Sequence, residues 1–157
     1  RDPYGIRFWP GFKGRDGCRT PMVWEEQAVY AGFSRGKPWL PIPEEHRLRA
    51  VSAQQHDADS VLAHYRETLA FRKKQPTLLA GDIRFVEAPE GVLAFERTSG
   101  TGSMLCVFNI ARDPVTFDLL DEFAKARFID VPGFPAPRHD GKTVSLPPLG
   151  IAFGIIG

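Results

Sequence analysis

Two arginines and an aspartate lie close together in the stretch RDGCRTP at residues 15–21. Arginine presents a rigid fork of hydrogen-bond donors and keeps its charge, so Arg15 and Arg19 suit the recognition of hydroxyls, carboxylates or phosphates. Asp16 is placed to orient either guanidinium. The same residues also fit a surface loop with a structural Arg–Asp pair, and the stretch alone leaves both interpretations open.

Other reactive side chains do not form a catalytic or metal-binding pattern. Cys18 lies between two arginines, which favours a thiolate, but no histidine accompanies it as a base, so we expect an inert thiol. The acids Asp16, Glu25 and Glu26 show no spacing typical of a tuned carboxylate pair. No histidine pairs with a further ligand at a metal-site spacing (the histidines are His46, His56, His64 and His139). We therefore expect no catalytic residue, metal or cofactor in this chain.

Composition excludes several classes of partner. The chain has 157 residues and a net charge of +1 from 20 basic and 19 acidic residues, without a cationic block. This balance predicts neither nucleic-acid binding nor attraction to an anionic membrane surface. No apolar run approaches membrane-spanning length. Cys18 and Cys106 are the only cysteines and are far apart, which favours free thiols and a cytoplasmic location.

Residues 1–56 are rich in proline, glycine and aromatic residues and sustain neither a helical nor a strand period. All three tryptophans, Trp9, Trp24 and Trp39, lie in this segment. Disordered segments are poor in aromatics, so we expect an ordered, irregular loop that serves a binding or active site. Its aromatic rings are either core residues or stacking platforms for sugar rings.

The rest of the chain has regular patterns. Capping residues at 57–60, apolar residues at helical spacing and Pro76 predict one helix over about 59–75. Beyond residue 79, short apolar runs separated by Gly/Pro turns predict an antiparallel sheet or sandwich. The expected strands are 82–87, 92–98, 104–110, 114–118, 126–129, 143–146 and 151–155. No polar cluster in this part indicates chemistry.

Several motifs together resemble one family. RDGCRTPMVW at 15–24, with AGF at 31–33 and PW at 38–39, resembles the α-glucosidase and oligo-1,6-glucosidase branch of the α-amylase superfamily, glycoside hydrolase family 13. DPYGIRFWP at 2–10 also looks like that branch. The run 57–82 is similar to the last barrel helix of the family and its exit into the C-terminal domain. The combined motif is much more specific than any of its parts.

The resemblance implies a fold and a function. Residues 1–78 would be the C-terminal part of a (β/α)₈ barrel, with a long loop between the eighth strand and the eighth helix, and residues 79–157 a C-terminal antiparallel β-sandwich. The family implies a retaining α-glucosidase that hydrolyses terminal α-glucosidic bonds of small sugars, with transglucosylation as a further activity. Its catalytic carboxylates come from earlier barrel strands. This chain alone would thus be inactive and need the N-terminal barrel portion.

The resemblance also assigns binding residues. Family members use the arginine of the RTP motif to bind hydroxyls of the terminal sugar, and this position corresponds to Arg19. Arg15 is the second choice, and Asp16 could orient either arginine. Val23 stands where the family often has Gln, and Glu25 where it often has Asp, so the finer substrate contacts differ.

Two other interpretations fit the sequence. The chain could be a stand-alone carbohydrate-binding or interaction module, with the sandwich as its core and the aromatic loop as its recognition surface. It could also be a structural remnant of a truncated enzyme, which would bind nothing and tend to aggregate because apolar surface is exposed.

Overall fold

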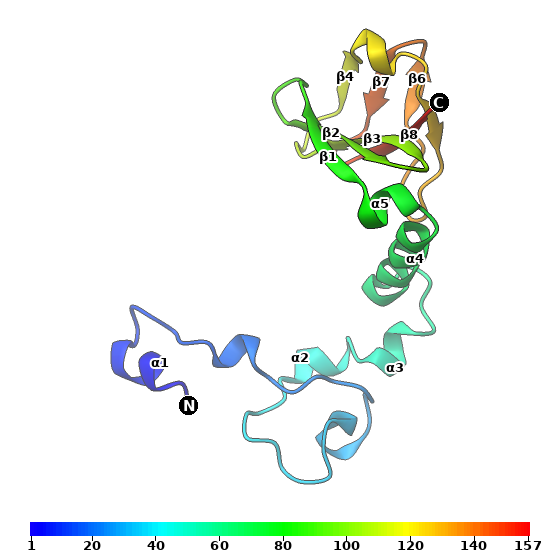
Figure 1. Ribbon diagram of the computed structural model, residues 1–157. Helices are drawn as coiled ribbons and strands as arrows, with labels where there is room; N and C mark the ends of the chain where they lie inside the picture. The colour runs from blue at the N-terminus through cyan, green and yellow to red at the C-terminus, as the bar shows by residue number, and fades with distance from the viewer. The chain divides into compact units, whose positions relative to one another are not determined.

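The computed structural model describes residues 1–157, which divide into two compact units, Arg1–His64 and Tyr65–Gly157. Figure 1 shows short helices and connecting loops in the first unit and mainly strands in the second. The units differ in what holds them together. The first has a small cluster of buried residues, whereas the second has two larger apolar clusters.

The first unit contains only short helical elements. They are α1 (Pro3–Phe8), α2 (Glu44–Arg47), α3 (Val51–Gln54) and the 3₁₀ turns η1 (Asp16–Cys18) and η2 (Val29–Gly32). The expectation that residues 1–56 lack regular structure is therefore wrong in detail. Each element spans at most six residues, so none is long enough to show the 3.6-residue period in the sequence.

Backbone hydrogen bonds join two segments of this unit that are distant in sequence. Val51 donates its N–H to the carbonyl of Val23 at 3.1 Å, and Ser52 donates to Trp24 at 2.9 Å. The buried cluster forms around this contact and consists of Val23, Ala31 and Ala50, with Ile42 and Ala53 packed against it. These few side chains fix the path of the aromatic-rich loop.

The predicted helix is confirmed as α4 (Val61–Lys73). The hydroxyl of Ser60 accepts the N–H of Ala63 at 3.1 Å, which satisfies a backbone donor at the helix start. Arg72 and Lys73 lie in the last turn, where positive charge complements the helix dipole. Pro76 then begins a second helix, α5 (Pro76–Ala80), because proline is tolerated at the first helical position.

The second unit is an antiparallel β-structure, as the sequence predicted. One sheet has the order β1-β2-β3-β8-β5, with strands Asp82–Val86, Val92–Ser99, Gly102–Asn109, Ile151–Ile156 and Arg127–Ile129. The other has the order β4-β7-β6, with strands Val115–Asp118, Thr143–Leu146 and Arg138–Asp140. All seven predicted strands are present. Strand β6 was not predicted, because its three residues are polar and exposed and so show no apolar alternation.

Strand β3 is buried on both faces. Leu105 and Val107 belong to the cluster between the two sheets, whereas Met104 and Cys106 belong to a cluster on the opposite face. Successive side chains of a strand point to opposite faces, so this two-sided burial explains the nearly continuous apolar run in the sequence. Helix α5 contacts β2 and β3 and contributes Leu78 to the second cluster.

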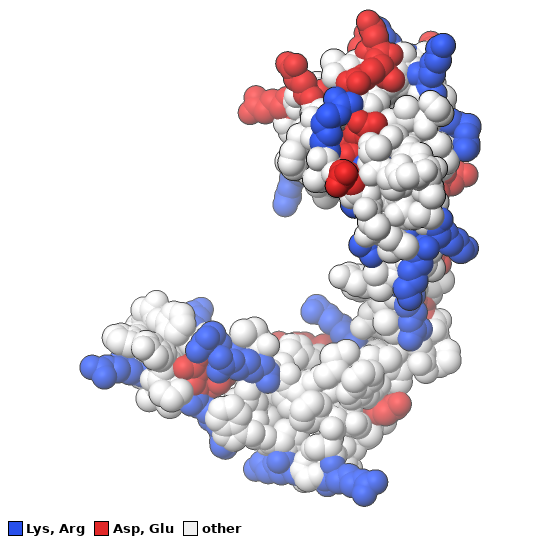
Figure 2. All heavy atoms as spheres, in the orientation of Figure 1, with Lys and Arg blue, Asp and Glu red and all other residues white.

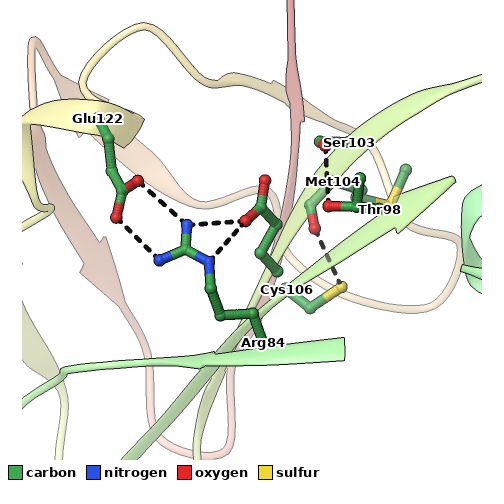
Figure 3. Close-up of polar contacts among 7 residues, drawn as sticks. Arg84, Thr98, Ser103, Met104, Cys106 and Glu122 are labelled. Atoms are coloured by element: carbon green, nitrogen blue, oxygen red, sulfur yellow. Dashed lines mark hydrogen bonds and ion pairs between the residues drawn. The ribbon is translucent and has the colours of Figure 1, made fainter. Parts of the chain in front are cut away.

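An ion-pair cluster joins β1 and β2 to the 3₁₀ turn η3 (Asp121–Phe123). Arg84 donates to both carboxylate oxygens of Glu122 at 3.2 and 3.0 Å (Figure 3), and to Glu96 at 2.7 and 3.0 Å. Its guanidinium also lies 5.6 Å from the ring centre of Phe123. No local sequence pattern indicates this cluster, because Glu96 and Glu122 lie 12 and 38 residues from Arg84 along the chain. We interpret it as a structural clamp.

Charges on the second unit are mixed in sign. Figure 2 shows basic and acidic side chains interspersed on its visible face, rather than one basic block. No helix of the chain combines the length and apolar character needed to cross a membrane.

Candidate substrate-binding loop

The loop that carries Arg15, Asp16 and Arg19 is fixed by Asp2. Asp2 is only 5% exposed, caps α1 by accepting the N–H of Tyr4 at 3.0 Å, and accepts the N–H of Arg15 at 2.9 Å. The Arg15 Nε lies 3.6 Å from the same carboxylate. The backbone N–H of Arg15, helped by that of Tyr4 and by the guanidinium charge, holds the pKa of Asp2 below its usual range.

Asp16 completes a reciprocal contact with the first residues. Its Oδ2 accepts the N–H of Asp2 at 2.9 Å and contacts the amino nitrogen of Arg1. Its Oδ1 is buried and has no hydrogen-bond partner within the chain. No arginine side chain contacts this carboxylate. Asp16 therefore braces the loop through the backbone, rather than orienting Arg15 or Arg19 directly.

Two glycines allow the segments to approach this closely. A Cβ placed on Gly5 would lie 2.9 Å from the Gly14 Cα, which is closer than real side chains permit. Gly14 has φ +75°, a conformation that other residues rarely adopt. The DPYG and GRDG sequences thus form one unit in three dimensions, although they are separated in the chain.

Arg19 follows the segment that Asp2 and Asp16 hold in place, and its side chain is free. Its N–H donates to the Asp16 carbonyl at 3.1 Å, which closes η1. Downstream, the Thr20 hydroxyl lies 3.4 Å from His46 Nδ1, and Pro21 is buried. The side chain of Arg19 is exposed and makes no hydrogen bond or ion pair within the chain. A charged fork on a fixed backbone suits a ligand with several oxygen atoms.

The other predicted site residues have different surroundings. Arg15 is exposed on the loop and is partly engaged by Asp2. Cys18 is exposed, and its thiol donates to the Arg15 carbonyl at 3.0 Å, with no histidine or carboxylate in contact with it. No group of three or more His, Cys, Asp or Glu side chains could hold a metal ion.

Sequence reasoning missed Asp2 as the anchor of this loop. An aspartate directly before proline is a signal for a helix N-cap, so its role in starting α1 was detectable. Its second role was not. The bond to Arg15 spans 13 residues, and no local pattern reports such a contact.

Comparison with known proteins defines first the class of the chain. The family model of the α-amylase catalytic domain matches residues 5–81, and that of the maltogenic amylase C-terminal domain matches residues 83–152. A catalytic-barrel segment followed by an antiparallel β-domain is the architecture that the sequence predicted, and it is confirmed. The predicted division at residues 78 and 79 stays a prediction, since the compact units of the structure divide within α4.

Sequence relatives and solved structures narrow the class. The probable α-glucosidase of Rhizobium meliloti (strain 1021) is 53% identical over 76% of this chain and 21% of its own length. The oligo-1,6-glucosidase of Parageobacillus thermoglucosidasius is 30% identical over 76% of this chain and 21% of its own length. The crystal structure of the α-glucosyl transfer enzyme XgtA matches all of this chain and 29% of its own, with TM-score 0.87 and 45% identity.

A more distant structure agrees. A mutant of the trehalulose synthase MutB matches 91% of this chain and 26% of its own, with TM-score 0.72 and 28% identity. The chain belongs to the α-amylase superfamily, in the α-glucosidase and oligo-1,6-glucosidase branch of glycoside hydrolase family 13. It spans about a fifth of the length of the curated relatives it matches.

Proposed function

We propose that this chain is the C-terminal portion of a retaining α-glucosidase that hydrolyses terminal α-glucosidic bonds of small sugars. The observation that carries the proposal is the free guanidinium of Arg19 on a loop braced by Asp2 and Asp16. The names of the relatives, α-glucosidase and oligo-1,6-glucosidase, support the same reaction.

Arg19 would bind hydroxyls of the terminal glucose and orient its ring. A retaining enzyme needs a carboxylate nucleophile and a carboxylic acid/base about 5–5.5 Å apart on the two sides of the scissile bond. In our proposal both come from preceding barrel strands, which form the partner of this chain. The part described here positions the sugar and supports the barrel, and by itself it does not catalyse the reaction.

Glucosyl transfer is a second candidate activity of the same site. It is favoured by the 45% identity to a structure named as an α-glucosyl transfer enzyme. In transfer, the hydroxyl of an acceptor sugar replaces water in attacking the covalent glycosyl-enzyme intermediate. The presence of one exposed and one buried free thiol is compatible with the cytoplasmic location that we propose for the enzyme.

The proposal is tested on the complete polypeptide that carries this chain, with an α-glucoside such as isomaltose as substrate. We expect Arg19→Ala to lower kcat/KM by about 10- to 150-fold, because a hydrogen bond to a charged group contributes about 1.5–3 kcal/mol. Arg35→Ala is the matched control, since Arg35 is also exposed and its side chain makes no hydrogen bond or ion pair within the chain. It should leave kcat/KM unchanged.

Two further results would contradict the proposal. Turnover of isomaltose by the purified 157-residue chain alone would show that catalytic groups lie within it. A complete polypeptide in which Arg19→Ala and Arg35→Ala behave alike would remove Arg19 from the site. Arg15→Ala separates the two candidate arginines, and we expect a smaller loss than for Arg19→Ala because Asp2 already engages Arg15.

A further inference from the structure

A left-handed backbone segment lies beside a cavity that the Arg19 loop does not line. Tyr30, Ala31 and Gly32 have φ values of 55°, 54° and 68°. Left-handed conformations cost roughly 1–2 kcal/mol for each residue other than glycine. Such strain persists only where the surrounding structure enforces it, and it concentrates at functional sites.

The surrounding structure does enforce it here. Ala31 is completely buried in the small cluster of the first unit. Its carbonyl accepts the N–H groups of both Trp24 and Glu25, at 3.0 and 3.1 Å. The result is a sharp chain reversal that leaves Tyr30 half-buried on the wall of the cavity.

A tryptophan also lines the cavity. Trp39 is 61% exposed and lies between Pro38 and the buried Leu40. The proline restricts the backbone and Leu40 is buried, so the backbone that carries the exposed indole is fixed on both sides. The cavity has a volume of about 390 Å³, within the range of roughly 300–1,000 Å³ typical of small-molecule sites.

The polar groups of the cavity are almost all donors. Arg47 is used structurally, because its Nη1 donates to the carbonyls of Glu26 and Ala28 at 2.6 and 3.2 Å. The Tyr30 hydroxyl, the Lys37 ammonium and the Trp39 indole N–H make no hydrogen bond within the chain. Arg1 also lines the cavity, and no carboxylate does. These groups line one cavity, and two of them belong to aromatic side chains.

We propose that this Tyr30–Trp39 cavity is a saccharide-binding site that takes a pyranose ring. A pyranose has an apolar C–H face, which suits the electron-rich face of Trp39, and a rim of hydroxyls, which suits the donors of Lys37 and Tyr30. The choice of a hexose rests on the proposed function. An anion would use the positive charges of Lys37 and Arg1 but would gain nothing from the exposed indole.

The test is glucose binding to the complete polypeptide, measured by saturation-transfer NMR and calorimetry. Glucose is not hydrolysed, and Arg19→Ala removes the contact proposed above. We expect saturable glucose binding to persist in Arg19→Ala and to weaken at least about tenfold when Trp39→Ala is added. Trp39→Phe should restore part of the affinity, and Lys37→Gln should weaken it without changing the fold.

Trp9→Ala is the matched control because Trp9 is similarly exposed, at 65%, and does not line this cavity. Circular dichroism verifies the fold of each variant. Three results would overturn the proposal: no saturable glucose binding in Arg19→Ala, equal binding with and without Trp39→Ala, or inorganic phosphate as the only ligand that competes for the cavity. If Trp39→Ala does not fold, the glucose affinities of Trp39→Phe and Lys37→Gln test the proposal instead.

The two proposals fail independently. Glucose binding that depends on Trp39 in a polypeptide without α-glucosidase turnover would contradict the proposed function and leave the cavity assignment standing. Full turnover that depends on Arg19, without binding that depends on Trp39, would do the reverse.

Discussion

Asp2 is the residue through which we expect the candidate loop to respond to pH. Its pKa lies below the ordinary value of 3.8 because backbone N–H groups stabilise the carboxylate. A lowered pKa in the folded state gives stability that is present above 3.8 and is lost as the pH falls through the lower folded value.

We therefore expect residues 1–20 to be protected from proteolysis at pH 5 and to lose protection progressively below about pH 3.8, as the pH approaches the lower folded pKa of Asp2. Limited digestion by pepsin across this range, with mass spectrometry of the fragments, measures the transition. Asp2→Asn should remove most of the pH dependence of this segment. A pH profile identical in both proteins would show that another group controls it.

Asn109 is a second residue whose role is clear from its contacts. It is 2% exposed, its amide nitrogen donates to the carbonyls of Asp113 and Pro147 at 2.8 and 2.9 Å, and its carbonyl accepts the Ala111 N–H at 3.0 Å. The side chain thus organises the turn after β3.

Replacing Asn109 with Ala removes all three of these hydrogen bonds at a site where the side chain is 2% exposed. We expect the free energy of unfolding to fall by about 2 kcal/mol or more, since each intramolecular hydrogen bond contributes about 0.5–1.5 kcal/mol. Urea denaturation measures the loss. Thr116→Ala is the matched control, because the Thr116–Ser145 hydroxyl contact is exposed. Its expected cost is within about 0.5 kcal/mol, and equal costs for both variants would contradict this account.

At the scale of elements, the sequence predicted what local pattern encodes. Helix α4 and the seven predicted strands were found because capping residues, apolar periodicity and Gly/Pro turns are local signals. The short helices, β6 and the left-handed turn at Tyr30 and Ala31 were not. Nothing in a tyrosine or an alanine indicates positive φ, because the reversal is imposed by burial of Ala31 and by two hydrogen bonds to its carbonyl.

The candidate site was likewise predictable only in part. The family motif placed Arg19 and Arg15 in an exposed loop, as the structure shows. The expected contact between Asp16 and the side chain of Arg15 or Arg19 is absent, and Asp16 Oδ2 instead accepts the N–H of Asp2. That exchange of partners is a tertiary effect and could not be derived from spacing.

The Arg84 clamp gives a prediction for an element contact. Arg84 joins β1 to β2 and η3 through exposed or partly exposed ion pairs. Because salt screens such pairs, Arg84→Ala should lower the Tm at low ionic strength, and the difference from the unsubstituted protein should narrow in 1 M NaCl. Arg138→Ala, an exposed arginine outside the clamp, should shift the Tm less. A Tm difference independent of salt would assign the effect to packing on Phe123.

At the scale of the whole molecule, α4 has an apolar stripe on its surface. Val61, Tyr65 and Leu69 follow each other at intervals of four residues and are all exposed. Side chains at this spacing share one helix face. In the proposed enzyme, the preceding barrel covers this stripe.

We expect the isolated chain to self-associate through the stripe as its concentration rises. Replacing Val61, Tyr65 and Leu69 together with Ser should keep it monomeric, as measured by sedimentation velocity. The same triple change should lower the stability of the complete polypeptide, where the stripe has a partner. Arg66→Ser with Glu67→Ser on the charged part of the helix is the control. Equal self-association in both variants would contradict this prediction.

The two-sided burial of β3 gives the second unit an internal reporter. Burial raises the pKa of the Cys106 thiol to about 12, and its side chain has no access to solvent. A thiol reagent can therefore reach Cys106 only when the strand separates from its neighbours, whereas Cys18 is exposed from the start. The labelling rate of Cys106 relative to that of Cys18 therefore measures how often the sheet opens. A partner or sugar that stabilises this unit would lower that ratio.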